Sequence, residues 1–209
     1  MPTTTAVPAL IPLSLLEAIR NLDTPVEDGL DELAEEIVVR RLGLSPTVAA
    51  QIQRYRQTAE RDGGVDADEA ISVVRLVGRR PDAPLVFADA GRRAARYAAR
   101  SHARPAWTLS RVSGGGLARR MAQRSAGHLA RRVFGGELRS DGEGIEVRMA
   151  DSLSVTALAD GSACAFYGAA YGELLRRLTG FEGAMLHERC RSQGGEACVW
   201  RSAAAEIYE

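Results

Sequence analysis

Three cysteines and one histidine near the C-terminus are the residues best suited to chemistry in this chain. Cys164, Cys190 and Cys198 are the only cysteines of the sequence, and His187 precedes Cys190 by three residues. Thiolate and imidazole are ligands that zinc prefers, and four of them complete a tetrahedral site without leaving a position for water. The spacing therefore favours a structural zinc site made of these four residues.

Two other interpretations of the cysteines stay open at this point: a Cys190–Cys198 disulfide, or three inert thiols in the core. The odd number of cysteines disfavours the disulfide in a chain from the cytoplasm. A cytoplasmic location is expected because the mildly apolar start lacks a basic opening and is interrupted by Pro8 and Pro12. No run of eighteen apolar residues occurs, so no membrane span is expected.

The composition excludes several classes of enzyme chemistry. All 27 basic residues are arginines, so lysine Schiff-base chemistry and a phosphate-binding lysine loop are ruled out. No GxGxxG dinucleotide turn and no flavin motif is found. The sequence therefore favours binding over catalysis.

The charge of the chain is zero overall but unevenly distributed. Between Gly91 and Gly136 there is no acidic residue, and eleven arginines lie there: Arg92, Arg93, Arg96, Arg100, Arg104, Arg111, Arg119, Arg120, Arg124, Arg131 and Arg132. Acidic residues gather between Glu27 and Glu36. The basic region either pairs with this acidic segment, within the chain or across a dimer, or forms an anion site. Nucleic-acid binding is disfavoured by the neutral net charge and the lack of a binding motif.

An all-helical N-terminal segment is predicted for residues 1–82. Thr24-Pro25 opens a capping box, and a helix from there to Gly43 follows from the apolar spacing. Ser45-Pro46 repeats the start signal for a second helix that reaches Asp62, and a third helix is predicted from Asp66 to Gly78.

A mixture of helices and strands is predicted after residue 82. A short apolar run ends at Ala90-Gly91, and an arginine-rich helix follows to about Ala103. Further helices are predicted at Leu117–Phe134 and Ala163–Thr179. Alternating patterns predict strands at Ile145–Met149 and Ser152–Val155. A final hairpin is predicted from Met185–Cys190 and Ala197–Trp200.

The C-terminal part resembles the 4-vinyl reductase domain family. The resemblance rests on the stretch Cys164-Ala-Phe-Tyr-Gly-Ala-Ala-Tyr-Gly-Glu-Leu-Leu, on His187-Glu-Arg-Cys190, on Gly194-Gly195 and on Cys198-Val-Trp200. This family includes a protein of bacteriochlorophyll synthesis and the sensor domains of phenol- and xylene-responsive regulators. It shares its fold with a vesicle-tethering (TRAPP) subunit.

The resemblance implies an α+β fold with an antiparallel sheet, packed helices and a zinc-stapled C-terminal hairpin over residues 83–209. Family members hold zinc through three cysteines and an acidic residue three positions before the second cysteine. Here His187 stands at that position. The departure leaves open whether His187 or the neighbouring Glu188 is the fourth ligand.

The resemblance also implies a function. A chain without an attached ATPase or DNA-binding domain is most similar to the bacteriochlorophyll-pathway branch, so we expect a carrier or chaperone for a tetrapyrrole intermediate, which could also meet a biosynthetic enzyme. The alternatives are a sensor of small aromatic effectors and a true vinyl reductase. A homodimer is expected because related domains dimerise.

The helix at Leu117–Phe134 is the expected wall of the pigment site. Arg124 and Arg132 could meet the carboxylates of a planar ligand, and Met121 belongs to the apolar face of the helix. His128, or His102 on the preceding helix, could be the axial ligand of a central magnesium.

Overall fold

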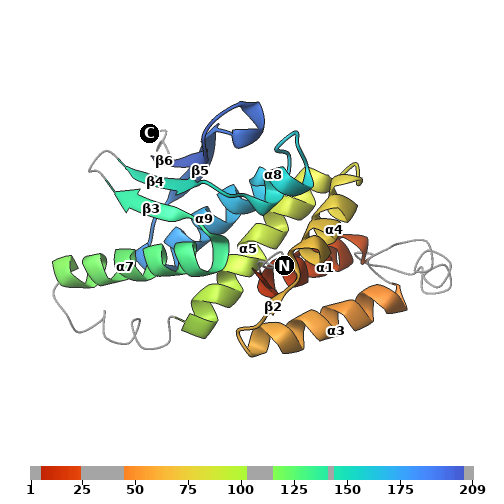
Figure 1. The fold of residues 1–209 in the computed structure, drawn as a ribbon. Helices are drawn as coiled ribbons and strands as arrows, with labels where there is room; N and C mark the ends of the chain where they lie inside the picture. The colour runs from red at the N-terminus through yellow and green to blue at the C-terminus, as the bar shows by residue number, and fades with distance from the viewer. Residues whose placement is uncertain (1–5, 25–44, 103–114, 141–143, 205–209) are drawn as a thin grey trace, which may run out of the picture.

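The chain folds into a mixed α+β structure with antiparallel sheets and packed helices (Figure 1). The computed structural model describes residues 6–24, 45–102, 115–140 and 144–204. The helices are α1 (Leu10–Asp23), α3 (Pro46–Glu60), α4 (Ala67–Gly78), α5 (Ala83–His102), α7 (Gly115–Phe134), α8 (Leu153–Ala157), α9 (Cys164–Thr179) and the 3-10 turn η2 (Arg191–Gln193). The strands are β1 (Val7–Pro8), β2 (Gly64–Val65), β3 (Glu137–Ser140), β4 (Ile145–Met149), β5 (Gly183–Arg189) and β6 (Cys198–Ala204).

Two of the three predicted N-terminal helices are confirmed. The Ser45 side chain accepts a hydrogen bond from the Val48 amide at the start of α3. Pro46 is the first residue of this helix, where the amide N–H that proline lacks would have no partner within the helix. Asp66 caps α4 by accepting from the Asp68 amide. The helix predicted from Thr24 to Gly43 lies outside the described residues, as does the acidic run between Glu27 and Glu36.

The sequence patterns did not indicate α1, which is a central helix of the core. Pro12 lies in its first turn, where a missing amide donor costs no intrahelical hydrogen bond. Leu13, Leu15 and Ile19 are buried on different sides of the helix. They are covered because α1 packs against α3, α4 and α5. Pro8 and Pro12 interrupt this apolar stretch in the sequence, and a proline within a pattern argues against a helix, so the sequence did not indicate α1.

The break expected at Ala90-Gly91 is wrong, because α5 runs without interruption through both residues. Gly91 lies where α5 meets α9, and a Cβ atom there would be 2.1 Å from the Phe166 carbonyl oxygen. This glycine therefore serves helix packing and does not end a helix. No helix among the described residues is both long and apolar enough to cross a membrane.

Ser152–Val155 was expected to be a strand and instead begins α8. The Thr156 amide donates to the Ser152 carbonyl oxygen, as in a helical turn. The alternation of serines and apolar residues reflects a local tertiary contact, since Ser154 is buried and faces Cys164. The strand at Ile145–Met149 and the helix at Ala163–Thr179 are confirmed as β4 and α9, whereas β3 was not predicted.

The main sheet has the order β3-β4-β6-β5, with every neighbouring pair antiparallel. The predicted final hairpin is confirmed as β5 and β6, which are two of the four strands of this sheet. In Figure 1, α9 lies beneath the sheet and α5 lies on the far side of α9, in line with the extensive packing between α5 and α9. The start of α9 lies next to the hairpin, since the sulfur of Cys164 is 3.9 Å from that of Cys190.

Described residues from both predicted segments share one hydrophobic core. Leu13 and Val77 of the N-terminal part belong to the same buried cluster as Phe87 and Trp200 of the C-terminal part. The division into 1–82 and 83–209 stays a prediction.

Candidate functional site

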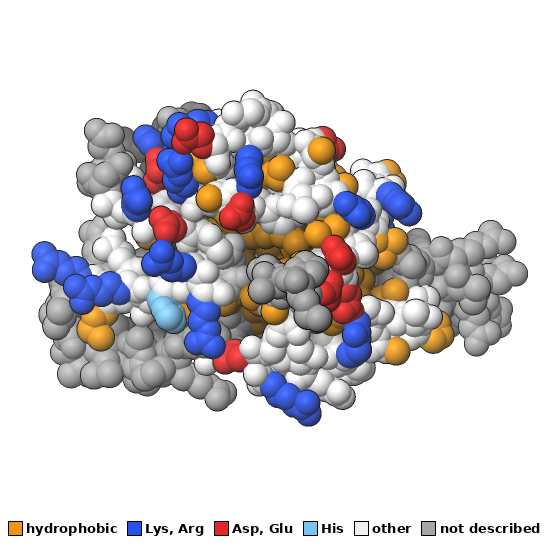
Figure 2. Space-filling model, viewed as in Figure 1, with side chains coloured by type: hydrophobic (Ala, Val, Ile, Leu, Met, Phe, Trp, Pro, Cys, Tyr) orange, Lys and Arg blue, Asp and Glu red, His pale blue; other side chains and the backbone are white. Residues whose placement is uncertain are grey.

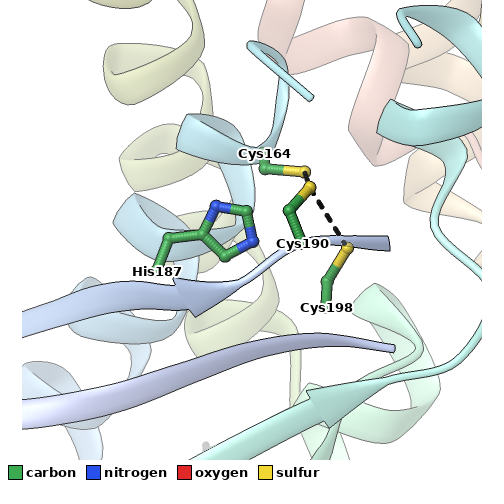
Figure 3. A group of neighbouring side chains, drawn as sticks. All are labelled: Cys164, His187, Cys190 and Cys198. Atoms are coloured by element: carbon green, nitrogen blue, oxygen red, sulfur yellow. Dashed lines mark hydrogen bonds between the residues drawn. The ribbon is translucent and has the colours of Figure 1, made fainter. Parts of the chain in front are cut away.

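The four predicted metal ligands converge at one point of the structure. One ligand atom each of Cys164, His187, Cys190 and Cys198 lies within 4.8 Å of all the others. The Sγ atoms of Cys164 and Cys190 are 3.9 Å apart, and so are those of Cys190 and Cys198. Figure 3 shows the three sulfur atoms together with the His187 ring beside them. This group could hold a metal ion.

The sulfur spacing is compatible with a bound metal ion and excludes a disulfide. All three cysteines are free, so the Cys190–Cys198 disulfide is not formed. Sulfur atoms bound to one tetrahedral zinc at about 2.3 Å lie about 3.8 Å apart. The two sulfur–sulfur distances of 3.9 Å are close to this value.

A β-bulge places His187 and Glu188 in different surroundings. His187 pairs with Trp200 and Arg189 pairs with Val199, so Glu188 is the extra residue of β5. The Glu188 carboxylate lies near the Arg201 guanidinium, with 3.5 Å between Oε2 and Nε. The His187 side chain therefore lies with the three cysteine side chains, and the Glu188 side chain does not.

Tight local turns bring the cysteines together. After Cys190 the chain forms η2, and the amides of Gln193 and Gly195 both donate to the Cys190 carbonyl oxygen. Gly194 ends this turn with a φ of 86°, a value that favours glycine. Gly161, before α9, also has a positive φ, and a Cβ atom there would be 2.8 Å from the Cys190 sulfur.

Several residues that sequence reasoning missed surround the four ligands. The hydroxyls of Ser154 and Ser192 lie 3.1 Å and 2.9 Å from the sulfurs of Cys164 and Cys190. The Arg191 amide donates to Cys198 at 3.5 Å. The indole of Trp200 stacks on the His187 ring, with 4.8 Å between ring centroids. Such partners orient metal ligands, and none of them follows a spacing rule in the sequence.

The electrostatics of the metal-free thiols disfavour three thiolates at once. Burial raises the pKa of Cys164 to about 12 and also raises the pKa of Cys198. Burial opposes ionisation of Cys190 too, but hydrogen bonds from Ser192 and the neighbouring thiols lower its pKa. Burial lowers the pKa of His187, which keeps the imidazole neutral. A bound dication would reverse this balance, since it deprotonates coordinating thiols.

The predicted ligand-binding residues of α7 lie mostly on its outer face. Arg124 and His128 are exposed, and Met121 is 42% exposed, so Met121 does not belong to the buried face as expected. The buried residues are Ala126, Leu129, Ala130, Val133 and Phe134, where α7 packs against α9 and β3. Basic side chains gather over α7 in Figure 2. The side chain of His102 lies outside the described part of the chain.

A cavity of about 350 Å³ lies between α1, α3, α5 and α7, and no sequence pattern pointed to it. Of the predicted ligand residues that the structure describes, Arg132 lines it. The lining residues are Ala6, Pro8, Leu10, Leu13, Arg56, Ala59, Glu60, Asp62, Gly63, Gly64, Tyr97, Ala98, Ser101, Arg132 and Val133. One sequence signal for this cavity was available, namely Glu17, a single acidic residue in the apolar segment that forms α1. Glu17 contacts Arg56 and Tyr97, which line the cavity.

Comparisons of this chain with known protein families, with curated proteins and with solved structures found no match.

Proposed function

We propose that Cys164, His187, Cys190 and Cys198 hold one zinc ion with a structural role. The convergence of their ligand atoms within 4.8 Å carries this proposal. Three thiolates and one imidazole complete a tetrahedral zinc site, so no position remains for a reacting water or substrate. The ion would join the start of α9 to the β5–β6 hairpin and so hold the C-terminal end of the sheet in place.

Elemental analysis of freshly purified protein tests this proposal. We expect about one equivalent of zinc per chain and a large loss of thermal stability after chelation, because structural zinc contributes directly to folding. Cys198→Ser should lose the metal. Arg189→Ala, a change at an exposed residue next to Cys190, is the control and should retain it. Protein that is purified without chelators and contains no metal would contradict the proposal.

The protein that contains this zinc site is, we propose, a binding domain of the 4-vinyl reductase type for a tetrapyrrole intermediate of bacteriochlorophyll synthesis. The residues from Cys164 to Trp200 that resemble the family support the assignment. The cavity of about 350 Å³ is near the lower limit of about 300–1,000 Å³ for drug-sized ligands, which is small for a four-ring macrocycle. The outer face of α7 is therefore the pigment site that we propose.

Four residues of α7 would form this pigment site. Met121, Arg124, His128 and Arg132 follow one another at intervals of three or four residues and so share one stripe of the helix. Met121 offers an exposed apolar contact, and His128 offers an imidazole for a central magnesium. Arg124 has no ion-pair partner among the described residues, so its guanidinium is available to a carboxylate.

Absorption spectra of the protein titrated with magnesium-protoporphyrin test the pigment site. His128→Ala should shift the visible bands, since an axial imidazole is lost. Arg124→Ala should weaken binding by about 1.5–3 kcal/mol, the scale of a hydrogen bond to a charged group. Arg92→Ala removes another exposed arginine, on α5, and is the control. Equal weakening by Arg92→Ala would show a general charge effect and contradict the site.

Binding without stand-alone reduction is the activity that we propose. A vinyl reduction needs a hydride donor, and a zinc ion with four protein ligands offers no open position for a Lewis acid. Pure protein incubated with a divinyl substrate and NADPH should leave both unchanged. Consumption of NADPH together with loss of the vinyl group would contradict this part of the proposal.

A further inference from the structure

The cavity between α1, α3, α5 and α7 has an apolar interior and a polar wall. Its apolar lining includes Leu10 and Leu13 of α1 and Ala98 of α5. Hydrophobic side chains also come to the surface in the middle of the face shown in Figure 2, over α1 and α5. Glu60 and Asp62 are exposed and mark the open side. The cavity is therefore suited to binding a compact apolar molecule.

A buried carboxylate organises the polar wall. Glu17 is 4% exposed and accepts two hydrogen bonds, from Arg56 Nη2 at 2.7 Å and from the Tyr97 hydroxyl at 2.8 Å. Burial and the bond to Glu17 raise the pKa of Tyr97, which keeps its hydroxyl protonated. The hydrogen bond to Glu17 also raises the pKa of Arg56. Both side chains are thus held at the cavity by one acceptor.

The hydrogen-bonding groups left free on this wall are complementary to a hydroxyl. The single proton of the Tyr97 hydroxyl is donated to Glu17, so its oxygen can only accept from a ligand. The remaining N–H groups of Arg56 have no partner among the described residues, so they can donate. A ligand group that donates to Tyr97 and accepts from Arg56 satisfies both.

The charges around the cavity favour a neutral ligand. The carboxylates of Glu17, Glu60 and Asp62 outnumber the guanidiniums of Arg56 and Arg132 by one. A carboxylate ligand would therefore meet net negative charge. An ammonium ligand would donate to Tyr97 but would lie against the Arg56 guanidinium.

We propose that this cavity is a second ligand site, which takes a compact, neutral, apolar molecule that ends in one hydroxyl group. Tyr97 and Arg56 bind the hydroxyl, and the apolar wall around Leu13 and Ala98 encloses the body of the molecule. The site contains none of the proposed zinc ligands, and Arg132 is the one residue that it shares with the proposed pigment site.

Three probes of the same shape and different charge test the proposal: cyclohexanol, cyclohexanecarboxylate and cyclohexylamine. Each is titrated into the full chain, and binding is followed by amide chemical shifts in NMR spectra. We expect saturable binding of cyclohexanol, with the largest shifts at Tyr97, Ala98 and Ser101. Binding should be about tenfold weaker or worse for both charged probes, since a buried group without a complementary partner is costly.

Two variants locate the binding. Ser101→Leu places an apolar side chain at the exposed edge of the cavity and should abolish cyclohexanol binding. Ala99→Leu adds the same side chain at a half-buried residue of α5 that does not line the cavity, and it is the control. Tyr97→Phe should weaken binding about two- to tenfold, the scale of one neutral hydrogen bond. None of these variants should change zinc content or pigment spectra, so failure here is distinguishable from failure of the proposed function.

Three results would overturn the proposal. One is no saturable binding of any probe to the folded chain. Another is tightest binding of the carboxylate, which would refute the charge argument. The third is cyclohexanol binding that Ser101→Leu and Tyr97→Phe leave unchanged, which would place the molecule elsewhere.

Discussion

The imidazole of His187 has surroundings that suit a neutral group, whereas the 4-vinyl reductase domains that the C-terminal part resembles have an acidic residue at this position. Burial lowers the pKa of His187, and the stacked Trp200 ring holds it at an interplanar angle of 14°. Three thiolates and a neutral imidazole around a zinc dication leave one net negative charge, whereas a carboxylate would leave two. Because buried charge is costly, the histidine would reduce the electrostatic penalty of the proposed zinc site.

We predict that His187 and Glu188 differ sharply in zinc binding. His187→Ala should weaken zinc affinity by more than the roughly 10–100-fold that loss of an outer partner causes. Glu188→Gln should bind zinc as the original chain does, because the bulge turns Glu188 toward Arg201. Competition with a chromophoric chelator measures both affinities. Equal losses in the two variants would contradict the ligand assignment.

The packing of α5 against α9 positions Cys164 of the candidate metal site. Cys164 begins α9, and its neighbour Phe166 faces Gly91 of α5 across the closest approach of the two helices. A side chain at residue 91 would separate the helices, since the nearest atoms belong to the backbone of α9. The start of α9, and therefore Cys164, depends on this glycine for its place.

Gly91→Ala is predicted to destabilise the protein by about 1–3 kcal/mol through overpacking. Its Cβ atom would lie 2.1 Å from the Phe166 carbonyl oxygen and 3.0 Å from the Ala170 amide nitrogen. Gly127→Ala in α7 is the matched control, because its Cβ atom would meet nothing closer than 4.0 Å. That change should raise the free energy of unfolding by up to about 1 kcal/mol through helix propensity. Urea unfolding measures both, and a neutral Gly91→Ala would refute the packing argument.

Across the whole molecule, buried and half-buried ion pairs connect helices that are far apart in the sequence. Arg80 bonds to Asp23 at the end of α1 and to Asp82 just before α5. Glu17 connects α1 to α3 and α5 in the same way. The N-terminal helices are thus tied to the C-terminal part by charge as well as by the shared core.

Acid should weaken the structure through Asp82. Hydrogen bonds from Arg80 lower the pKa of Asp82 in the folded chain. A lowered carboxyl pKa contributes stability above the unfolded value of about 3.9, and this contribution is lost as the pH falls through the folded pKa. Unfolding midpoints should therefore fall between about pH 5 and pH 2, and less steeply in Asp82→Asn. Glu196→Gln, at a carboxylate 92% exposed, should keep the original slope. An unchanged slope in Asp82→Asn would contradict this assignment.

We also predict that the chain forms a homodimer. The acidic residues between Glu27 and Glu36 and the basic face of α7 are complementary charges within one sequence, so two copies offer each other opposite charges. Light scattering at low salt should give twice the monomer mass, and high salt should weaken the association. A monomer mass at all concentrations and salt levels would refute the prediction.

The sequence by itself determined the donor set of the candidate metal site and the elements with clear local signals. Ser45-Pro46 and Asp66 begin helices wherever they occur in a suitable pattern, because capping depends on neighbouring residues only. The β5–β6 hairpin follows from alternation around a glycine turn for the same reason. Three cysteines and a histidine near that hairpin already favoured zinc.

Tertiary structure alone decided what depends on partners distant in the chain. The burial of α1 against α3, α4 and α5 is seen only in the folded chain, and the contact with Cys164 decided the conformation around Ser154. The bulge in β5 places His187, and not Glu188, beside the cysteines, because pairing with β6 sets the register of β5. The cavity beside Glu17 forms where four helices from different parts of the chain meet, so no local sequence pattern could predict it.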